Sequence, residues 1–168
     1  MKILIADDNS DELEITKRAL SKIRHDLRLE TTMSGEATLE KLSNQEDLPS
    51  LILLDKKMHG MSGIETLRKI RADRRLKHIP VIMLSALARE ADKEEALSLG
   101  ANSFILKAFD LDEFSRDLET HLEYFLDQRP ETRDQRPKQK KAPQPNNQAE
   151  GQFREADAIS GRIMRPPL

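Results

Sequence analysis

The chain has 168 residues, no cysteine and a formal net charge of −2, so one ordinary domain fits with residues to spare, and disulfides or cysteine-based zinc sites are excluded. The small net charge gives no general signal for nucleic acid or membrane surfaces. No apolar run approaches the roughly 20 residues that cross a bilayer, and the N-terminal MKILIADD is too short for a signal-peptide core. We therefore expect a soluble, cytoplasmic protein without membrane contact.

Five short runs have the length and the mainly apolar composition of buried β-strands. They are separated by longer segments that are rich in charged residues. The predicted strands are residues 2–6, 27–31, 51–54, 81–84 and 103–106.

Apolar residues in the segments between these runs recur every three or four positions, as on the buried face of an amphipathic helix. Ser10 is expected to cap the first helix, and Gly100 to follow the last turn of the fourth. The predicted helices are residues 10–23, 36–42 and 89–99, with two more marked by apolar residues within 64–70 and 111–125.

Five strands that alternate with five helices predict the α/β class, with a doubly wound parallel sheet covered by helices on both faces. Right-handed crossovers leave few topologies for such a sheet. Ligands of such sheets bind beyond the carboxyl ends of the strands, so functional side chains are expected directly after each strand.

Residues 127–168 differ in composition from residues 1–126. They hold six of the eight prolines and nine Lys and Arg against six Asp and Glu, whereas residues 1–126 hold 19 against 24. With few large apolar residues, this stretch lacks the material for a core. We predict one domain at residues 1–126 and a disordered, basic, Pro/Gln-rich tail at residues 127–168.

Polar side chains follow four of the predicted strands. Asp7 and Asp8 follow the first, Asp55 the third, Ser85 the fourth and Lys107 the fifth. Three carboxylates at one edge resist ionisation unless a cation is near, and Mg²⁺ suits such oxygen ligands. Lysine and serine can bind phosphoryl oxygens, and aspartate can form an acyl phosphate. The set therefore predicts phosphoryl chemistry.

Each of these residues also has an ordinary interpretation when it is taken alone. Asp8 or Asn9 can cap the first helix, Ser85 can be a loop hydroxyl, and Lys107 can be a surface lysine. Their joint occurrence at four strand ends favours the functional interpretation.

Four sequence blocks resemble the signature of response-regulator receiver domains, and the resemblance covers about residues 1–126. The blocks are ADDNS, LILLDKKMHGMSG, PVIMLSA and GANSFILKAF. The resemblance implies a flavodoxin-like sheet in the order 2-1-3-4-5.

The family also implies a role for each matching position. Asp55 resembles the phosphoacceptor. Asp7 and Asp8 resemble the acidic pair that binds Mg²⁺ together with Asp55, with Asp8 as the more direct ligand. Lys57 would offer its backbone carbonyl to the same ion.

Three further positions match residues that respond to phosphorylation in the family. Ser85 and Lys107 resemble the pair that senses the phosphoryl group. Phe104 resembles the aromatic switch residue, which turns inward when the hydroxyl shifts. The alternative for Phe104 is plain core packing.

Three positions depart from the family pattern. His59 stands where proline is usual, and we expect a surface loop residue there rather than a metal ligand, since His suits Mg²⁺ poorly. Ala108 replaces the proline after Lys107, which implies either a cis peptide bond or a rebuilt loop. The Lys57 side chain is expected near the phosphorylation pocket, where it would alter the lifetime of the phosphorylated state, unless it points into solvent.

The resemblance implies a single-domain response regulator that takes a phosphoryl group from a sensor histidine kinase or a histidine phosphotransfer protein. Residues 89–126, the fourth helix, fifth strand and fifth helix, would form the face for a downstream protein or a homodimer, without a DNA-binding domain. Activity beyond Mg²⁺-dependent self-phosphorylation and self-dephosphorylation is not expected. Two alternatives are a phosphorylation-independent binding module and an aspartyl-phosphate hydrolase, and Lys57 disfavours the second because such enzymes usually have Asp there.

Overall fold

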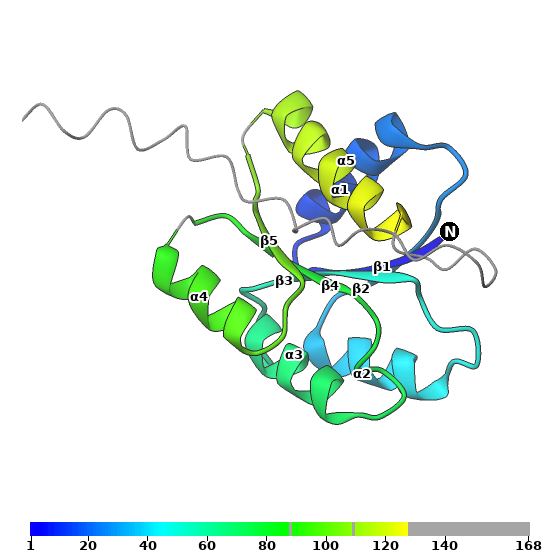
Figure 1. Cartoon of the computed structure of the whole chain (residues 1–168), viewed down its shortest axis with the longest axis vertical. Helices are drawn as coiled ribbons and strands as arrows, with labels where there is room; N and C mark the ends of the chain where they lie inside the picture. Colours follow the sequence, from blue (N-terminus) through cyan, green and yellow to red (C-terminus); the bar gives the residue numbers. More distant parts are fainter. Residues whose placement is uncertain (88, 109, 128–168) are drawn as a thin grey trace, which may run out of the picture.

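The computed structural model describes residues 1–87, 89–108 and 110–127. Five parallel strands form one sheet in the order β2-β1-β3-β4-β5, as the resemblance implied (Figure 1). The strands are β1 (Lys2–Ala6), β2 (Arg28–Thr32), β3 (Leu51–Asp55), β4 (Val81–Ser85) and β5 (Ser103–Leu106). The helices are α1 (Ser10–Ile23), α2 (Gly35–Asn44), α3 (Gly63–Ala72), α4 (Glu90–Ser98) and α5 (Leu111–Asp127).

Helices cover both faces of the sheet, with α1 and α5 on one side and α2, α3 and α4 on the other (Figure 1). Because successive side chains of a strand point to opposite faces, each central strand contributes to two apolar cores. Ile52 and Leu54 of β3 belong to the core with α2, α3 and α4. Leu51 and Leu53 belong to the core with α1 and α5. This two-sided burial makes β3 a rigid support for the residue at its end.

The N-cap of α1 is Asn9, so the capping alternative given for this residue is confirmed and the expectation that Ser10 caps the helix is wrong. Asn9 has an extended backbone, and its side-chain oxygen accepts hydrogen bonds from the amides of Asp11 and Glu12. Asn satisfies the first free amides of a helix as well as Ser does. Gly100 has a φ of +96° directly after the C-cap residue Leu99 of α4, as the sequence predicted.

The observed strands differ from the predicted ones by single residues. β3 includes Asp55 and β4 includes Ser85, whereas the prediction ended each strand one residue earlier. Asp55 and Ser85 are therefore fixed by the backbone hydrogen bonds of the sheet.

The last turn of α5 contains Asp127, and the rest of the predicted tail lies outside the described residues. Among the helices of the described part of the chain, none is long and apolar enough to cross a membrane.

Gly63, the first residue of α3, lies directly against the end of β3. Its amide donates to the Lys56 carbonyl at 3.0 Å, and a Cβ at this position would lie 2.0 Å from the carbonyl oxygen of Asp55. The neighbouring atoms belong to the backbone, so they cannot move aside without shifting β3 or α3. Only glycine allows this approach.

Gly63→Ala is therefore expected to lower the free energy of unfolding by roughly 2–3 kcal/mol, because the methyl group forces α3 away from the end of β3. Urea denaturation would measure the loss. Glu40→Ala, at an exposed position of α2, is the control and should change stability by about 0.5 kcal/mol or less. Equal stability of the Gly63→Ala variant and the wild type would contradict the close contact.

Candidate functional site

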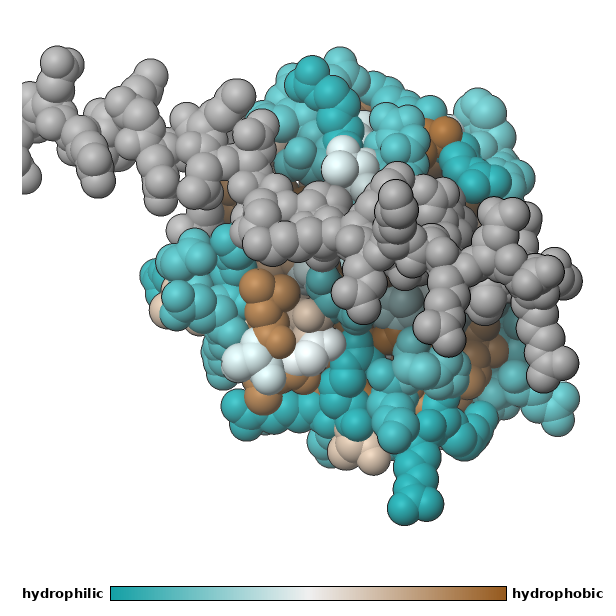
Figure 2. All heavy atoms as spheres, in the orientation of Figure 1, coloured by the Kyte–Doolittle hydropathy of each residue, from teal (hydrophilic) through white to brown (hydrophobic). Residues whose placement is uncertain are grey.

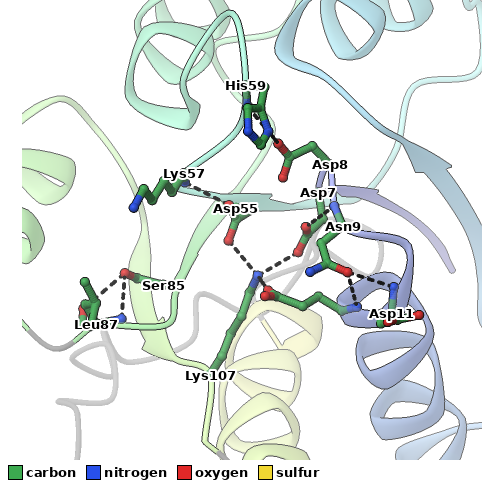
Figure 3. A network of polar contacts seen from close by, with 11 residues as sticks. Asp7, Asp8, Asn9, Asp11, Asp55, Lys57, His59, Ser85, Leu87 and Lys107 are labelled. Carbon is green, nitrogen blue, oxygen red and sulfur yellow. Dashed lines mark hydrogen bonds and ion pairs between the residues drawn. The ribbon is translucent and has the colours of Figure 1, made fainter.

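Three aspartates meet at the carboxyl edge of the sheet. Asp7 and Asp8 follow β1, and Asp55 is the last residue of the neighbouring strand β3. One carboxylate oxygen from each lies within 4.8 Å of the other two, and Asp7 and Asp55 are buried. The structure thus brings together the three carboxylates that the sequence placed at two separate strand ends (Figure 3).

Lys107 enters this acidic group from the end of β5. Its ammonium donates to Asp7 Oδ2 and to Asp55 Oδ1, both at 2.6 Å, and it also pairs with Glu12 of α1. The backbone amide of Lys107 donates to the Ser85 carbonyl at 2.8 Å, which fixes the start of the side chain beside β4. One cation therefore joins residues from β1, β3, β5 and α1 (Figure 3).

The electrostatics of the site follow from burial and from the ion pairs. Burial raises the pKa of the Asp55 carboxyl above its ordinary value, although the nearby Lys107 ammonium acts in the opposite direction. Burial also disfavours the charged form of Lys107, but the carboxylates of Asp55, Asp7 and Glu12 outweigh it and raise the pKa of Lys107. Lys107 is thus charged at neutral pH.

Backbone amides hold the two buried carboxylates, those of Asp7 and Asp55. The Lys57 amide donates to Asp55 Oδ2 at 2.8 Å, so Asp55 receives one donor on each oxygen. The Asn9 amide donates to Asp7 Oδ1 at 2.9 Å. These bonds orient the aspartates without using a side chain that a phosphoryl group would need.

His59 contacts Asp8, although the sequence predicted only a surface loop residue there. Its backbone amide donates to Asp8 Oδ2 at 2.8 Å, and its ring Nδ1 lies against the same oxygen (Figure 3). The imidazole is otherwise exposed. The amide of His59 is the main cause that lowers the pKa of Asp8. His59 thus acts on a predicted metal ligand without lying in the buried part of the site.

Ser85 and Phe104, two of the three residues predicted to respond to phosphorylation, make their contacts outside the group of carboxylates. Ser85 Oγ donates to the Leu87 carbonyl at 3.0 Å and accepts from the Leu87 amide, so its hydroxyl is engaged within its own loop (Figure 3). Phe104 is buried in the core with α2, α3 and α4.

The Lys57 side chain is exposed and extends away from Asp7 and Asp8 (Figure 3). There is no cis peptide bond among the described residues, so of the two expectations for Ala108 the cis bond is wrong. The ammonium of Lys107 nevertheless reaches Asp55.

An ion pair connects the end of β3 with α4. Lys56 Nζ lies 2.5 Å from Asp92 Oδ2, and both side chains are mostly buried. The Lys56 amide donates to the Leu84 carbonyl of β4 at 2.8 Å. The residue next to Asp55 is therefore tied both to the sheet and to the first turn of α4.

The donor set suits a hard divalent cation. Asp7, Asp8 and Asp55 provide carboxylate oxygens, and these are the ligands that Mg²⁺ prefers in proteins. The negative charge of three carboxylates and Glu12 exceeds the single charge of Lys107, so a further cation is favoured.

Sequence reasoning missed Glu12 and the role of His59. Glu12 lies in the acidic run DDNSDE, yet its spacing from Asp7 gives no sign that Lys107 comes within reach. Only the order of the strands and the position of α1 bring these two residues together. His59 could be recognised from the sequence as a departure from the family pattern, since it lies four positions after Asp55. Its contact with Asp8 could not be recognised in this way.

Comparisons with known proteins agree with this geometry. The family model of the response regulator receiver domain matches residues 3–119. The chemotaxis protein CheY1 of Helicobacter pylori is 38% identical over 109 residues, which are 65% of this chain and 86% of that protein.

Solved structures of response regulators are also similar. The phosphorylated cyanobacterial phytochrome response regulator RcpA has a TM-score of 0.70 and 27% identity, covering 77% of this chain and 96% of that one. The Mn²⁺-bound form of the response regulator Rcp1 has a TM-score of 0.67 and 25% identity, with the same coverage of 77% and 96%.

Because the pKa of Asp55 is raised, removing the charge of this residue is predicted to increase the free energy of unfolding. Between pH 3.8, the ordinary value, and its raised value, the folded protein binds more protons than the unfolded chain, so Asp55 costs stability as the pH rises. Asp55→Asn should raise the free energy of unfolding of the metal-free protein at neutral pH, on the order of 1 kcal/mol. The gain should vanish as the pH falls below 3.8.

Urea denaturation over this pH range would measure the effect. Asp11→Asn is the control, because it removes the same charge from an exposed position of α1 and should bring no gain. A destabilised Asp55→Asn variant at neutral pH would contradict a cost of burying the charged Asp55 carboxylate.

Proposed function

This chain belongs to the response regulator receiver domain family, and on that premise we propose that Asp55 accepts a phosphoryl group from a sensor histidine kinase or a histidine phosphotransfer protein. The strongest support is the position of Asp55, a buried carboxylate at the end of β3 with Lys107 on one oxygen and a backbone amide on the other. Phosphoryl transfer depends mainly on positioning and charge neutralisation, and this arrangement provides both.

The proposed transfer forms a bond between a carboxylate oxygen of Asp55 and phosphorus while the phosphorus–nitrogen bond of the donor histidine breaks. The imidazole leaves with the bonding electron pair. Lys107, which contacts Asp55 at 2.6 Å, would then pair with a phosphoryl oxygen. Ser85 would leave its contact with the Leu87 carbonyl and donate to another oxygen of the group.

We propose that Mg²⁺ binds to the carboxylates of Asp7, Asp8 and Asp55 and to the backbone carbonyl of Lys57. When bound, it would neutralise charge on the phosphoryl oxygens. The donor set supports this, and related structures are described as a Mn²⁺-bound form of Rcp1 and a phosphorylated form of RcpA. Lys107 and the backbone amide of Lys57 would hold Asp55 in its orientation when the ion binds.

The signal is proposed to leave the domain through the face formed by α4, β5 and α5. Leu97 of α4 and Leu106 of β5 are about two-fifths exposed, and apolar groups lie at the surface in this region (Figure 2). Movement of Ser85 would let Phe104 change its packing, and a downstream protein or a second copy of the chain would read the change. Residues 1–126 are proposed to form this receiver domain.

The alternative is a phosphorylation-independent binding module on the same fold. It would not need the buried ion pairs that Lys107 makes with Asp55 and Asp7, and burying charged groups is costly even when they are paired. The complete set of acidic, hydroxyl and ammonium groups therefore favours the phosphoacceptor.

Incubation with Mg²⁺ and a small phosphodonor such as acetyl phosphate is expected to label Asp55 with an acid-stable, base-labile phosphate. Mass spectrometry of the intact protein would measure it. The Asp55→Asn variant and a sample with excess chelator should stay unlabelled. Failure to label the wild type, or a label that persists in Asp55→Asn, would contradict the proposal.

Lys57 is proposed to slow the loss of the phosphoryl group. Its exposed ammonium, two residues after Asp55, attracts the phosphoryl charge at longer range than Lys107 does. Lys57→Ala should shorten the lifetime by about two- to threefold, the effect of one exposed charge. Dephosphorylation rates after removal of the donor would measure this. Lys77→Ala, at an exposed position after α3, is the control; an equal effect of both variants would count against a specific role for Lys57.

A further inference from the structure

We propose that Glu12 is a positioning residue that restrains Lys107, so that a phosphoryl group on Asp55 must take the ammonium away from Glu12. The inference rests on the proposed function, since it concerns the same lysine and the same acceptor. Glu12 lies in the first turn of α1 and is not part of the predicted acidic pair.

The donors of Lys107 are all in use. An ammonium group has three N–H bonds, and Asp7, Asp55 and Glu12 each provide an acceptor. A new acceptor on Asp55 can therefore bind Lys107 only if one of the three existing contacts is lost. The geometry makes the phosphoryl group a competitor of these carboxylates.

Burial decides which of the three contacts is lost at the lowest cost. The side chains of Asp7 and Asp55 are 2% and 8% exposed, whereas that of Glu12 is 35% exposed. A released Glu12 carboxylate can be hydrated, but a released Asp7 carboxylate would stay buried without its cation. If the phosphoryl group forms on Oδ2 of Asp55, Oδ1 remains as an uncharged acceptor beside Lys107. Of the two partners that stay carboxylates, Asp7 and Glu12, Glu12 is thus the one that gives up Lys107.

The surroundings of Glu12 leave room for this release. Glu12 and Lys107 border a cavity of about 350 Å³ between α1 and α5, which is also lined by Ile15, Leu111 and Phe114. The cavity provides space beside the Glu12 side chain for its carboxylate to leave Lys107. A phosphoryl group carries a charge of about −2, so it attracts Lys107 more strongly than one carboxylate does.

Glu14 provides a matched control on the same helix. It is exposed and pairs with Lys17 at 2.7 Å, outside the group around Lys107. Glu14→Gln removes the same charge as Glu12→Gln from nearly the same place in the sequence. A comparison of the two variants separates the specific contact from the change in net charge.

The test measures binding of beryllofluoride, a stable substitute for the phosphoryl group, to the full chain at Mg²⁺ concentrations that saturate each variant. Glu12→Gln should bind about three- to tenfold more tightly than the wild type, because Lys107 is free to pair with the fluoride ligands. Glu14→Gln should bind as the wild type does. In a Lys107→Ala background, Glu12→Gln should bring no gain.

Weaker or equal binding by Glu12→Gln would overturn the inference, as would an equal gain in Glu14→Gln or a gain that persists without Lys107. Absence of binding by the wild type at saturating Mg²⁺ would instead overturn the proposed function. These outcomes distinguish the two proposals.

The metal-free protein offers an independent measurement. The free energy of unfolding of the wild type, Glu12→Gln, Lys107→Ala and the double variant forms a double-mutant cycle. We expect favourable coupling between Glu12 and Lys107, and none between Glu14 and Lys107. Zero coupling between Glu12 and Lys107 would show that the contact does not restrain the lysine.

Discussion

The site depends on one interaction, the pairing of a single buried ammonium with several carboxylates. Without Lys107, the carboxylates of Asp7 and Asp55 would repel each other in a place that water barely reaches. The lysine comes from β5, at one edge of the sheet, while the aspartates come from β1 and β3 in its middle. The same ion pairs therefore balance the charge of the site and hold the strand ends together. A charge added at Asp55 has to redistribute this balance, which couples the chemistry of one residue to the positions of β1, β3, β5 and α1.

Much of this arrangement could be predicted from the sequence because it follows from periodicity and from parallel topology. Short apolar runs between amphipathic segments predicted all five strands within one residue at either end. The topology then places Asp55 and Lys107 together at the carboxyl ends of the strands, because all strands of a parallel sheet end on the same side. Local competition was harder to predict: Asn9 and Ser10 are both good capping residues, and only the backbone geometry shows that Asn9 takes the position. Glu12 could not be assigned because its contact with Lys107 depends on the packing of α1 over the sheet.

In the loop after β3, backbone amides orient two carboxylates, and a search for side-chain motifs does not detect such contacts. The amides of Lys57 and His59 donate to Asp55 and Asp8 respectively, so two residues of one loop orient two different carboxylates. Neither bond depends on the side chain of its donor. The side chain of Lys56, in contrast, points toward Asp92 and links the loop to α4. The segment from Lys56 to His59 thus connects the proposed phosphoacceptor, a predicted metal ligand and a helix of the proposed signalling face.

The departure at His59 is therefore more than a change on the surface. Proline, which the family usually has at this position, carries no amide hydrogen, so it could not donate to Asp8. With His59 in its place, Asp8 gains a backbone donor and a ring contact, both on Oδ2. Among the hydrogen bonds of the described residues none involves Oδ1 of Asp8, so this oxygen is available for the proposed metal ion. The bonds lower the pKa of Asp8, so it stays ionised, and they fix its direction before any cation binds. A carboxylate that is already oriented loses less entropy on binding a metal ion, although the shared negative charge on Oδ2 attracts that ion less strongly. His59 thus exchanges part of the electrostatic attraction for preorganisation of the proposed Mg²⁺ site.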